Sequence, residues 1–197
     1  ASRAMYDASI AAGITHFDTA HMYTDGASER ILGGMIGPDR DRLIIATKAG
    51  YTGGGTYSNI TSTFEISRQR LQMDMVDILY LHRFDPDTDL RESMQAFADL
   101  KSKGQIRYVG VSNFAAWQVM KAIASAAEFD LRIDIVQPMY NLVKRQAEVE
   151  ILPMCMDQDV ACAPYSPLGG GLLTGKYAAK GSGRLTEDDR YAARYGK

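Results

Sequence analysis

Four side chains that together could transfer a proton stand at the ends of apolar runs in this 197-residue chain: Asp18, Tyr23, Lys48 and His82. Asp18, Lys48 and His82 each close or directly follow such a run, and Tyr23 lies one short loop after Asp18. Their spacing is about one strand–helix unit each time, which is the period of a parallel βαβ array. Because all strands of a parallel barrel end at the same rim, we expect these four residues to converge there.

An acid, a phenol, an amine and an imidazole on one rim suit the reduction of a carbonyl group. That reaction needs a hydride at carbon and a proton at oxygen, and no side chain delivers hydride, so a nicotinamide cofactor is implied. A phenol has an ordinary pKa near 10, and a neighbouring ammonium such as that of Lys48 lowers the pKa by favouring phenolate. Asp18 can neutralise and orient Lys48, while His82 can donate a hydrogen bond to the substrate oxygen.

Taken alone, each of the four has a plainer explanation. An aspartate after a strand is often a turn or cap residue, a tyrosine in a loop often packs, and a lysine at a strand end is often solvated. A histidine that follows an apolar strand is as often a satisfied core residue as a catalyst. What favours a site is that Asp18, Lys48 and His82 occupy the same position in successive units.

The elements expected to position these residues are short β-branched runs that alternate with amphipathic helices. This alternation predicts an α/β fold with a parallel sheet and right-handed crossovers. The expected strands cover residues 14–19, 43–48, 76–81, 106–111, 133–137 and 160–164. The expected helices cover 2–12, a short segment after Ser28, 60–71, a segment around 90–101 capped by Asp87, Thr88 or Asp89, 116–127 and 146–158.

An open doubly wound sheet would show the same alternation, but it carries a GxGxxG turn after its first strand, and none is present. The sequence therefore predicts a (β/α)8 TIM barrel that forms a single domain over residues 1–197, with six βα units visible. Since the chain begins inside a helix and ends in the polar run 184–197, we expect one strand to be missing at the front and at least one at the back. On this hypothesis the chain is part of a longer product, since a barrel without those strands would leave two unpaired sheet edges.

Composition excludes several classes of function. The chain is 46% hydrophobic and 23% charged with a formal net charge of −2, which is ordinary for a globular protein and gives no reason to expect a nucleic-acid partner. No apolar stretch approaches the roughly 18 residues of a membrane span, and no signal-peptide pattern is present, so we expect a cytoplasmic protein without a membrane partner. Cys155 and Cys162 match no metal spacing, and we expect no metal. The sequence leaves open whether the chain forms a homo-oligomer.

A glycine-rich run near the end of the chain has the spacing of a P-loop from Gly170 to Lys176. Tyr177 stands where a magnesium-binding Ser or Thr should follow, which argues against a nucleoside triphosphatase. Glycines followed by a lysine still let backbone amides approach a pyrophosphate. A second glycine run, Gly53 to Gly55, is expected to be a flexible loop. The alternative is that this loop contacts the substrate.

Longer motifs around these residues resemble the aldo-keto reductase family, in the branch that includes bacterial enzymes and potassium-channel β-subunits. The resemblance covers essentially the whole chain in the right order. The matching segments are Phe-Asp-Thr-Ala at 17–20 followed by Tyr23, Ala-Thr-Lys at 46–48, Leu-His at 81–82, Gly-Val-Ser-Asn-Phe at 110–114, Val-Gln-Pro-Met-Tyr-Asn at 136–141 and Tyr-Ser-Pro-Leu at 165–168. The resemblance implies an eight-stranded βα barrel that reduces aldehydes and ketones with NADPH.

By that resemblance Tyr23 is the general acid, Lys48 and Asp18 tune it, and His82 orients the carbonyl group of a small substrate. Residues later in the chain are implied to bind the cofactor. Ser112, Asn113 and Gln137 would hold the nicotinamide carboxamide, Tyr165 would stack on the ring, and Ser166, Leu168, Gly170, Lys176 and Arg184 would lie along the remainder of the dinucleotide. The choice of NADP over NAD comes from the resemblance alone.

Two other functions remain open at this stage. The chain could be a regulatory or cofactor-binding subunit without useful turnover, as in the channel β-subunits of this superfamily, or an inactive fragment. A barrel enzyme acting on phosphate esters would require metal-ligand clusters, which His16, His21 and His82 do not supply.

Overall fold

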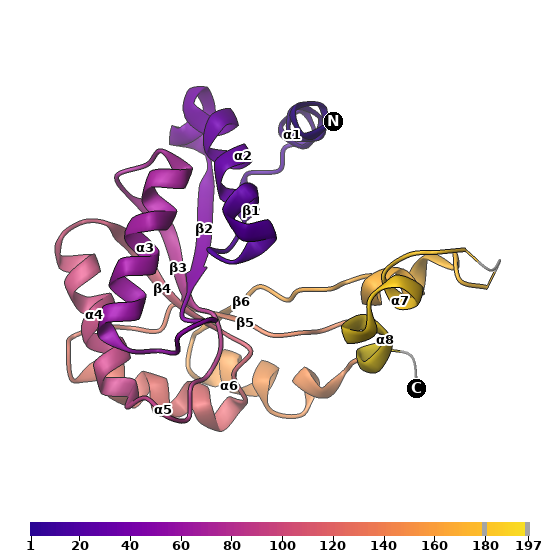
Figure 1. Ribbon diagram of the computed structural model, residues 1–197. Helices are drawn as coiled ribbons and strands as arrows, with labels where there is room; N and C mark the ends of the chain where they lie inside the picture. The colour runs from indigo at the N-terminus through magenta and orange to yellow at the C-terminus, as the bar shows by residue number, and fades with distance from the viewer. Residues whose placement is uncertain (179–180, 196–197) are drawn as a thin grey trace. The chain divides into compact units, whose positions relative to one another are not determined.

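The computed structural model describes residues 1–178 and 181–195 (Figure 1). The chain divides into two compact units, Ala1–Ile135 and Val136–Lys197. The expectation of a single domain over residues 1–197 stays a prediction.

The first unit is built on a parallel sheet. Its strands β1 (His16–Asp18), β2 (Ile44–Ala49), β3 (Val76–Leu81) and β4 (Ile106–Ser112) pair in chain order, with every pair parallel. The chain then enters β5 (Ile135–Gln137) beside β4, where Asp134 donates its backbone N–H to the Val109 carbonyl at 2.8 Å. All six residues of β3 are buried, as expected for a strand covered on both faces.

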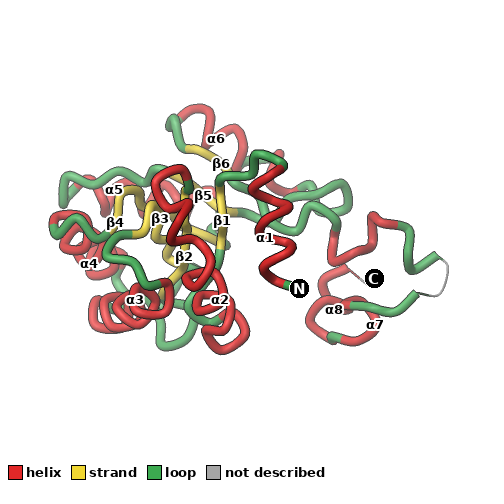
Figure 2. Tube along the Cα trace, turned by 90° about the horizontal axis from the view of Figure 1, so that it is seen from above, coloured by secondary structure: helices red, strands yellow, loops and turns green. Residues whose placement is uncertain are grey.

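Helices connect these strands. They are α1 (Ser2–Ala11), α2 (Ala27–Ile36), α3 (Tyr57–Leu71), α4 (Leu90–Ser102) and α5 (Ala116–Ala127), with short 3₁₀ segments η1 (Tyr23–Gly26) and η2 (Gly37–Arg42). Figure 2 shows α2, α3 and α4 along the outer side of the strands. Of the three cap residues expected for α4, Asp89 is the cap, and its carboxylate accepts the Arg91 backbone N–H at 2.9 Å.

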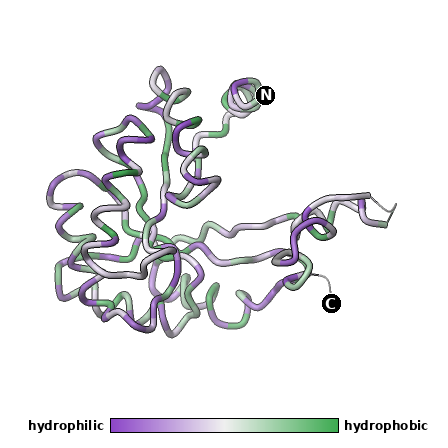
Figure 3. The backbone as a smooth tube through the Cα atoms, in the orientation of Figure 1, coloured by the Kyte–Doolittle hydropathy of each residue, from purple (hydrophilic) through white to green (hydrophobic). Residues whose placement is uncertain are grey.

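The core of the first unit lies on both faces of this sheet. Apolar side chains of α4 at helical spacing are buried against the sheet, among them Leu90, Met94, Phe97 and Leu100. On the other face Ala46, Ile78 and Tyr80 form a cluster with Ile135 packed against it. In Figure 3 the strand β2 is coloured mostly as hydrophobic. Burial on both faces holds the strand ends in place.

The second unit pairs the end of β5 with β6 (Ala161–Cys162): Ala163 donates its N–H to the Val136 carbonyl at 3.0 Å, and Tyr165 donates to Pro138 at 2.9 Å. Its helical segments are η3 (Gln146–Glu148), α6 (Ile151–Asp157), η4 (Gly169–Thr174), α7 (Arg184–Glu187) and α8 (Asp189–Tyr195).

The strand order follows the chain from β1 to β6, which is the order of successive units in a βα barrel. The predicted α/β fold is therefore confirmed as a partial barrel of this type. Strands β5 and β6 are shorter than expected. In the described residues no helix is long and apolar enough to cross a membrane.

The single helix predicted over residues 146–158 is wrong, since η3 and α6 replace it. Pro153 explains the break. A proline ring clashes with the carbonyl four residues earlier, here that of Val149, so Pro153 is tolerated only in the first turn of a helix. The helix accordingly starts at Ile151.

Candidate active site

The carboxyl ends of β1, β2 and β3 bring three of the predicted residues to one edge of the sheet. Asp18 is the last residue of β1, Lys48 is the penultimate residue of β2, and His82 directly follows β3. Parallel pairing aligns these ends, and the ladder continues to His82, whose N–H donates to the Ala49 carbonyl at 2.8 Å.

The Lys48 ammonium lies inside the first unit with its side chain 0% exposed. It donates to the carboxylate of Asp18 and, at 2.8 Å, to the carbonyl oxygen of Thr19. Desolvation by burial lowers the pKa of Lys48, and the charge of Asp18 opposes that shift. The Asp18 carboxylate and the Thr19 carbonyl thus orient the Lys48 ammonium, whose charged form would be unfavourable in an apolar core without them.

Tyr23 places its ring beside both Lys48 and His82. The Lys48 Nζ atom lies 4.9 Å from the centroid of the Tyr23 ring. The Tyr23 and His82 ring centroids are 5.8 Å apart, and the rings meet edge to face at 80°. Tyr23 is 38% exposed, so part of this residue faces solvent. The structure therefore brings together the four residues that the sequence singled out.

His82 is a neutral imidazole in this environment. Its exposed fraction is 5%, and burial, reinforced by the charges of Lys48 and Arg83, lowers its pKa to about 3. Among the described residues its buried Nδ1 atom has no hydrogen-bond partner. A neutral imidazole carries one N–H donor and one acceptor nitrogen. At neutral pH His82 can thus donate a hydrogen bond to a carbonyl oxygen without itself being a cationic acid.

Tyr51 is a contact of the site that the sequence analysis missed. Its ring centroid lies 4.9 Å from that of His82, and the Arg83 guanidinium carbon lies 4.8 Å from the centroid of Tyr51. The available signal was its place two residues after the end of β2, on the same rim as Lys48. The nearby glycine loop is also more tightly held than expected, since Gly55 donates its N–H to Asp85 at 2.8 Å.

Ser112 and Asn113 lie at the carboxyl end of β4. Ser112 is buried, and the Asn113 side-chain amide donates to the His82 carbonyl at 3.0 Å and to the Ser112 hydroxyl at 3.1 Å. Asn113 has a φ of +58°, a left-handed conformation that asparagine adopts more readily than most residues. A hydroxyl and an amide supply both donors and acceptors, which is the chemistry that a nicotinamide carboxamide requires. The chemistry of these residues fits the nicotinamide cofactor that the family resemblance implies.

The other predicted cofactor residues belong to the second unit. Gln137 is buried at the end of β5, and Tyr165 forms a parallel bridge with Met139. The remaining positions follow β6 in loops and short helices: Ser166 with a φ of +60°, the exposed Leu168, Gly170 within η4, Lys176, and Arg184 as the first residue of α7.

The glycine run in this unit folds around Lys176 and Tyr177. The Lys176 Nζ atom lies 4.9 Å from the centroid of the Tyr177 ring. The Tyr177 hydroxyl donates to the Gly170 carbonyl at 3.2 Å and accepts the Leu185 N–H at 3.1 Å. Tyr177 therefore stabilises the run, which agrees with the argument against a P-loop.

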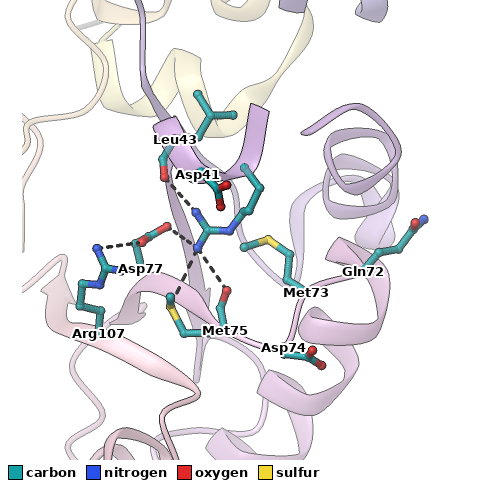
Figure 4. A pocket seen from close by; sticks show the side chains of 9 residues that line it. Asp41, Leu43, Gln72, Met73, Asp74, Met75, Asp77 and Arg107 are labelled. Carbon is teal, nitrogen blue, oxygen red and sulfur yellow. Dashed lines mark hydrogen bonds and ion pairs between the residues drawn. The ribbon is translucent and has the colours of Figure 1, made fainter. Parts of the chain in front are cut away.

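A cavity of about 390 Å³ lies at the opposite ends of the strands (Figure 4). Its lining comes from the residues around the start of β2, β3 and β4. Arg40 donates to the carbonyls of Leu43 at 2.9 Å and Met75 at 3.3 Å and pairs with the buried Asp77 at 2.8 Å. Asp77 also accepts the Ile45 N–H at 2.9 Å. These bonds join strand starts to each other, so we assign this cavity a structural role.

No group of three or more His, Cys, Asp or Glu side chains suited to a metal ion occurs in the described part of the chain.

Comparison with known proteins places these observations in a family. A family model described as "Aldo/keto reductase family" matches residues 1–193. Human aflatoxin B1 aldehyde reductase member 2 is 39% identical over 183 residues, covering 90% of this chain and 51% of the relative. Escherichia coli L-glyceraldehyde 3-phosphate reductase is 35% identical over 179 residues, covering 84% and 52% respectively.

A third relative has a different kind of name. The probable voltage-gated potassium channel subunit beta of Arabidopsis thaliana is 36% identical over 191 residues, covering 91% of this chain and 57% of the relative. The chain thus spans about half the length of the curated relatives it matches.

Proposed function

This chain belongs to the aldo/keto reductase family, and we propose that it reduces an aldehyde or ketone to an alcohol with NADPH as the hydride donor and Tyr23 as the proton donor. Membership implies carbonyl reduction with a nicotinamide cofactor in general; the choice of NADPH and the role of each residue are part of the proposal. One observation carries it: the Lys48 ammonium, paired with Asp18, lies 4.9 Å from the centroid of the Tyr23 ring.

The proton would come from the Tyr23 hydroxyl. As that proton moves to the substrate oxygen, negative charge develops on the phenol, and the nearby Lys48 ammonium stabilises it. Asp18 and the Thr19 carbonyl hold the ammonium in one direction, so little rearrangement is needed when the charge appears.

His82 would orient the carbonyl group. Its ring meets that of Tyr23 edge to face, and its pKa of about 3 keeps it neutral near pH 7. A neutral N–H donor beside the substrate oxygen polarises the carbonyl bond without competing with Tyr23 as the acid.

NADPH would supply the hydride when bound. Ser112, Asn113 and Gln137 would hold its carboxamide, and Tyr165 would lie against its ring. Ser166, Leu168, Gly170, Lys176 and Arg184 would contact the rest of the dinucleotide. A small carbonyl compound as substrate and a cytoplasmic location complete the proposal.

The test follows the absorbance of NADPH in the presence of an aromatic aldehyde, using the protein at its natural length. Tyr23→Phe should lower kcat by about 10²-fold or more, the usual contribution of a positioned general acid. A fluorescence titration should show that this variant binds NADPH as the parent does. Tyr108→Phe is the matched control, since Tyr108 is exposed on β4, and it should keep full activity. Retention of more than half of the parent's activity by Tyr23→Phe would exclude the proposed role.

A regulatory, cofactor-binding subunit is the second candidate. The similarity to the plant channel β-subunit favours it, because that relative is named for a channel and not for a reaction. Tight NADPH binding by the parent without turnover of any aldehyde or ketone in a broad panel would support this candidate against the first.

A further inference from the structure

The loop that carries Tyr23 is held from outside the sheet by an arginine that the mechanism above does not use. We infer that Arg70 and Glu29 are positioning residues, which fix the loop of residues 20–26 so that the phenol stays beside the Lys48 ammonium. This inference rests on the proposed function. The arrangement of Arg70, Glu29 and the backbone groups they contact is called the arginine clamp below.

Arg70, near the end of α3, contacts the loop on both sides of Tyr23. Its Nη1 atom donates to the His21 backbone carbonyl at 2.9 Å. On the other side of Tyr23 its guanidinium packs against Gly26, where an added Cβ would lie only 2.3 Å from the Arg70 Cζ atom. Gly26 has a φ of +79°, so both its backbone conformation and this contact require glycine. The guanidinium thus braces the loop two residues before and three residues after Tyr23.

Glu29 connects the same arginine to the strand that carries Lys48. Its side chain on α2 is 0% exposed, and its Oε2 atom accepts from Arg70 at 3.2 Å. Its Oε1 atom accepts from the Thr47 hydroxyl at 2.6 Å. Thr47 directly precedes Lys48, and alternation in a strand turns these two side chains to opposite faces. One carboxylate therefore links the outer face of β2, behind Lys48, to the clamp on the Tyr23 loop.

This geometry makes the clamp a device for position rather than for stability. A buried ion pair is often no more stabilising than apolar residues of similar volume, so a gain in stability alone does not explain why this pair is present. Its contacts converge on the two chain segments whose relative position sets the distance between phenol and ammonium. A misplacement of about 1 Å at reacting groups can lower a rate about 10²-fold.

Arg68→Met is a matched control for Arg70→Met. Arg68 lies on the same helix, and its side chain is 18% exposed against 21% for Arg70. It pairs with Glu65 at 3.0 Å and donates to the Asp74 carbonyl at 2.7 Å, both on its own helix or the turn after it. Replacing Arg68 therefore removes a comparable charge without touching the loop.

The first measurement separates kcat from KM in aldehyde reduction. We expect Arg70→Met to lower kcat about tenfold or more through the misplaced phenol, with the KM for aldehyde and the affinity for NADPH within about twofold of the parent. Arg68→Met should keep kcat within about twofold. Arg70→Lys, which keeps a donor near the His21 carbonyl, should recover part of the loss. Equal kcat values for Arg70→Met and Arg68→Met would overturn the inference.

The second measurement does not depend on turnover. The backbone N–H groups of His21 and Tyr23 bond to the carbonyls of Lys48 at 3.1 Å and Ala20 at 3.0 Å. Their hydrogen exchange should accelerate about tenfold or more in Arg70→Met, because the loop opens locally, and should not change in Arg68→Met. Unchanged exchange in Arg70→Met would also overturn the inference.

The two measurements distinguish the inference from the proposed function. If exchange is faster in Arg70→Met but the parent reduces no carbonyl compound, the positioning role of Arg70 stands and the proposed reductase activity is excluded. If Arg70→Met does not fold, Glu29→Gln serves in its place, since it keeps the side-chain shape but removes the charge that holds Arg70 and replaces one of the two acceptor oxygens by a donor NH2 group. It should raise exchange at His21 and Tyr23 and lower kcat, and parent values for both would overturn the inference.

Discussion

Replacing His82 by glutamine should reduce the loss of stability that this protein undergoes between pH 7 and pH 5. The pKa of His82 is about 3 in the folded protein, because burial and the neighbouring Lys48 and Arg83 disfavour the imidazolium. In the unfolded chain a histidine has an ordinary pKa of about 6.5. Between these two values the unfolded state binds a proton that the folded state does not, so the free energy of unfolding falls as the pH falls.

The size of this effect follows from the two pKa values. Integrating the difference in bound protons from pH 7 down to pH 5 gives a loss of about 2 kcal/mol for His82 alone. The loss continues toward pH 3 and then levels off, because below that pH both states are protonated. Glutamine does not titrate in this range, so the variant lacks this contribution.

Urea unfolding of the parent and of His82→Gln at both pH values measures the effect. The parent should lose about 2 kcal/mol more than His82→Gln between pH 7 and pH 5. His16→Gln is the control, since His16 is exposed, and it should follow the parent. His21, whose pKa burial also lowers, is present in all three proteins, so its contribution cancels. Equal losses in the parent and His82→Gln would refute the assignment of His82 as a neutral, buried imidazole.

Two further predictions concern Lys48 and the packing of α2. Lys48→Met should lower kcat about 10²-fold or more. It should change the free energy of unfolding by no more than about 2 kcal/mol, because methionine avoids the desolvation of a buried ammonium. Lys103→Met, at an exposed position, is the control, and a fall in stability large enough to account for the lost activity would contradict this separation. Gly33→Ala should cost about 1–3 kcal/mol in thermal or urea unfolding, because its Cβ would lie 2.6 Å from backbone carbonyls at the end of α3. A Cβ added at the neighbouring Gly34 would meet no atom within 4 Å, so Gly34→Ala should raise the free energy of unfolding by about 0.5–1 kcal/mol. Matching effects at the two glycines would refute the packing argument.

The sequence by itself was sufficient for the order of the strands and for the grouping of Asp18, Lys48 and His82 at one edge of the sheet. Strand and helix periods are local properties of the chain, and a parallel array sends every strand end to one edge, so Asp18, Lys48 and His82 could be grouped before any coordinates. The same local reasoning failed at residues 146–158, where the position of Pro153 outweighed the helical pattern.

Tertiary structure alone decided the protonation state of His82 and the contacts that hold the catalytic candidates in position. The neutral state of His82 depends on how deeply its ring is buried beside Lys48, and burial is a property of the packed chain that no sequence spacing reports. The arginine clamp joins Glu29, Thr47 and Arg70 across α2, β2 and α3, on the outer side of the sheet and away from the strand ends that the sequence pattern marks. The energy of a buried charge is set by partners that are far away in the sequence but close in space, because desolvation and Coulomb energies depend on distance in space.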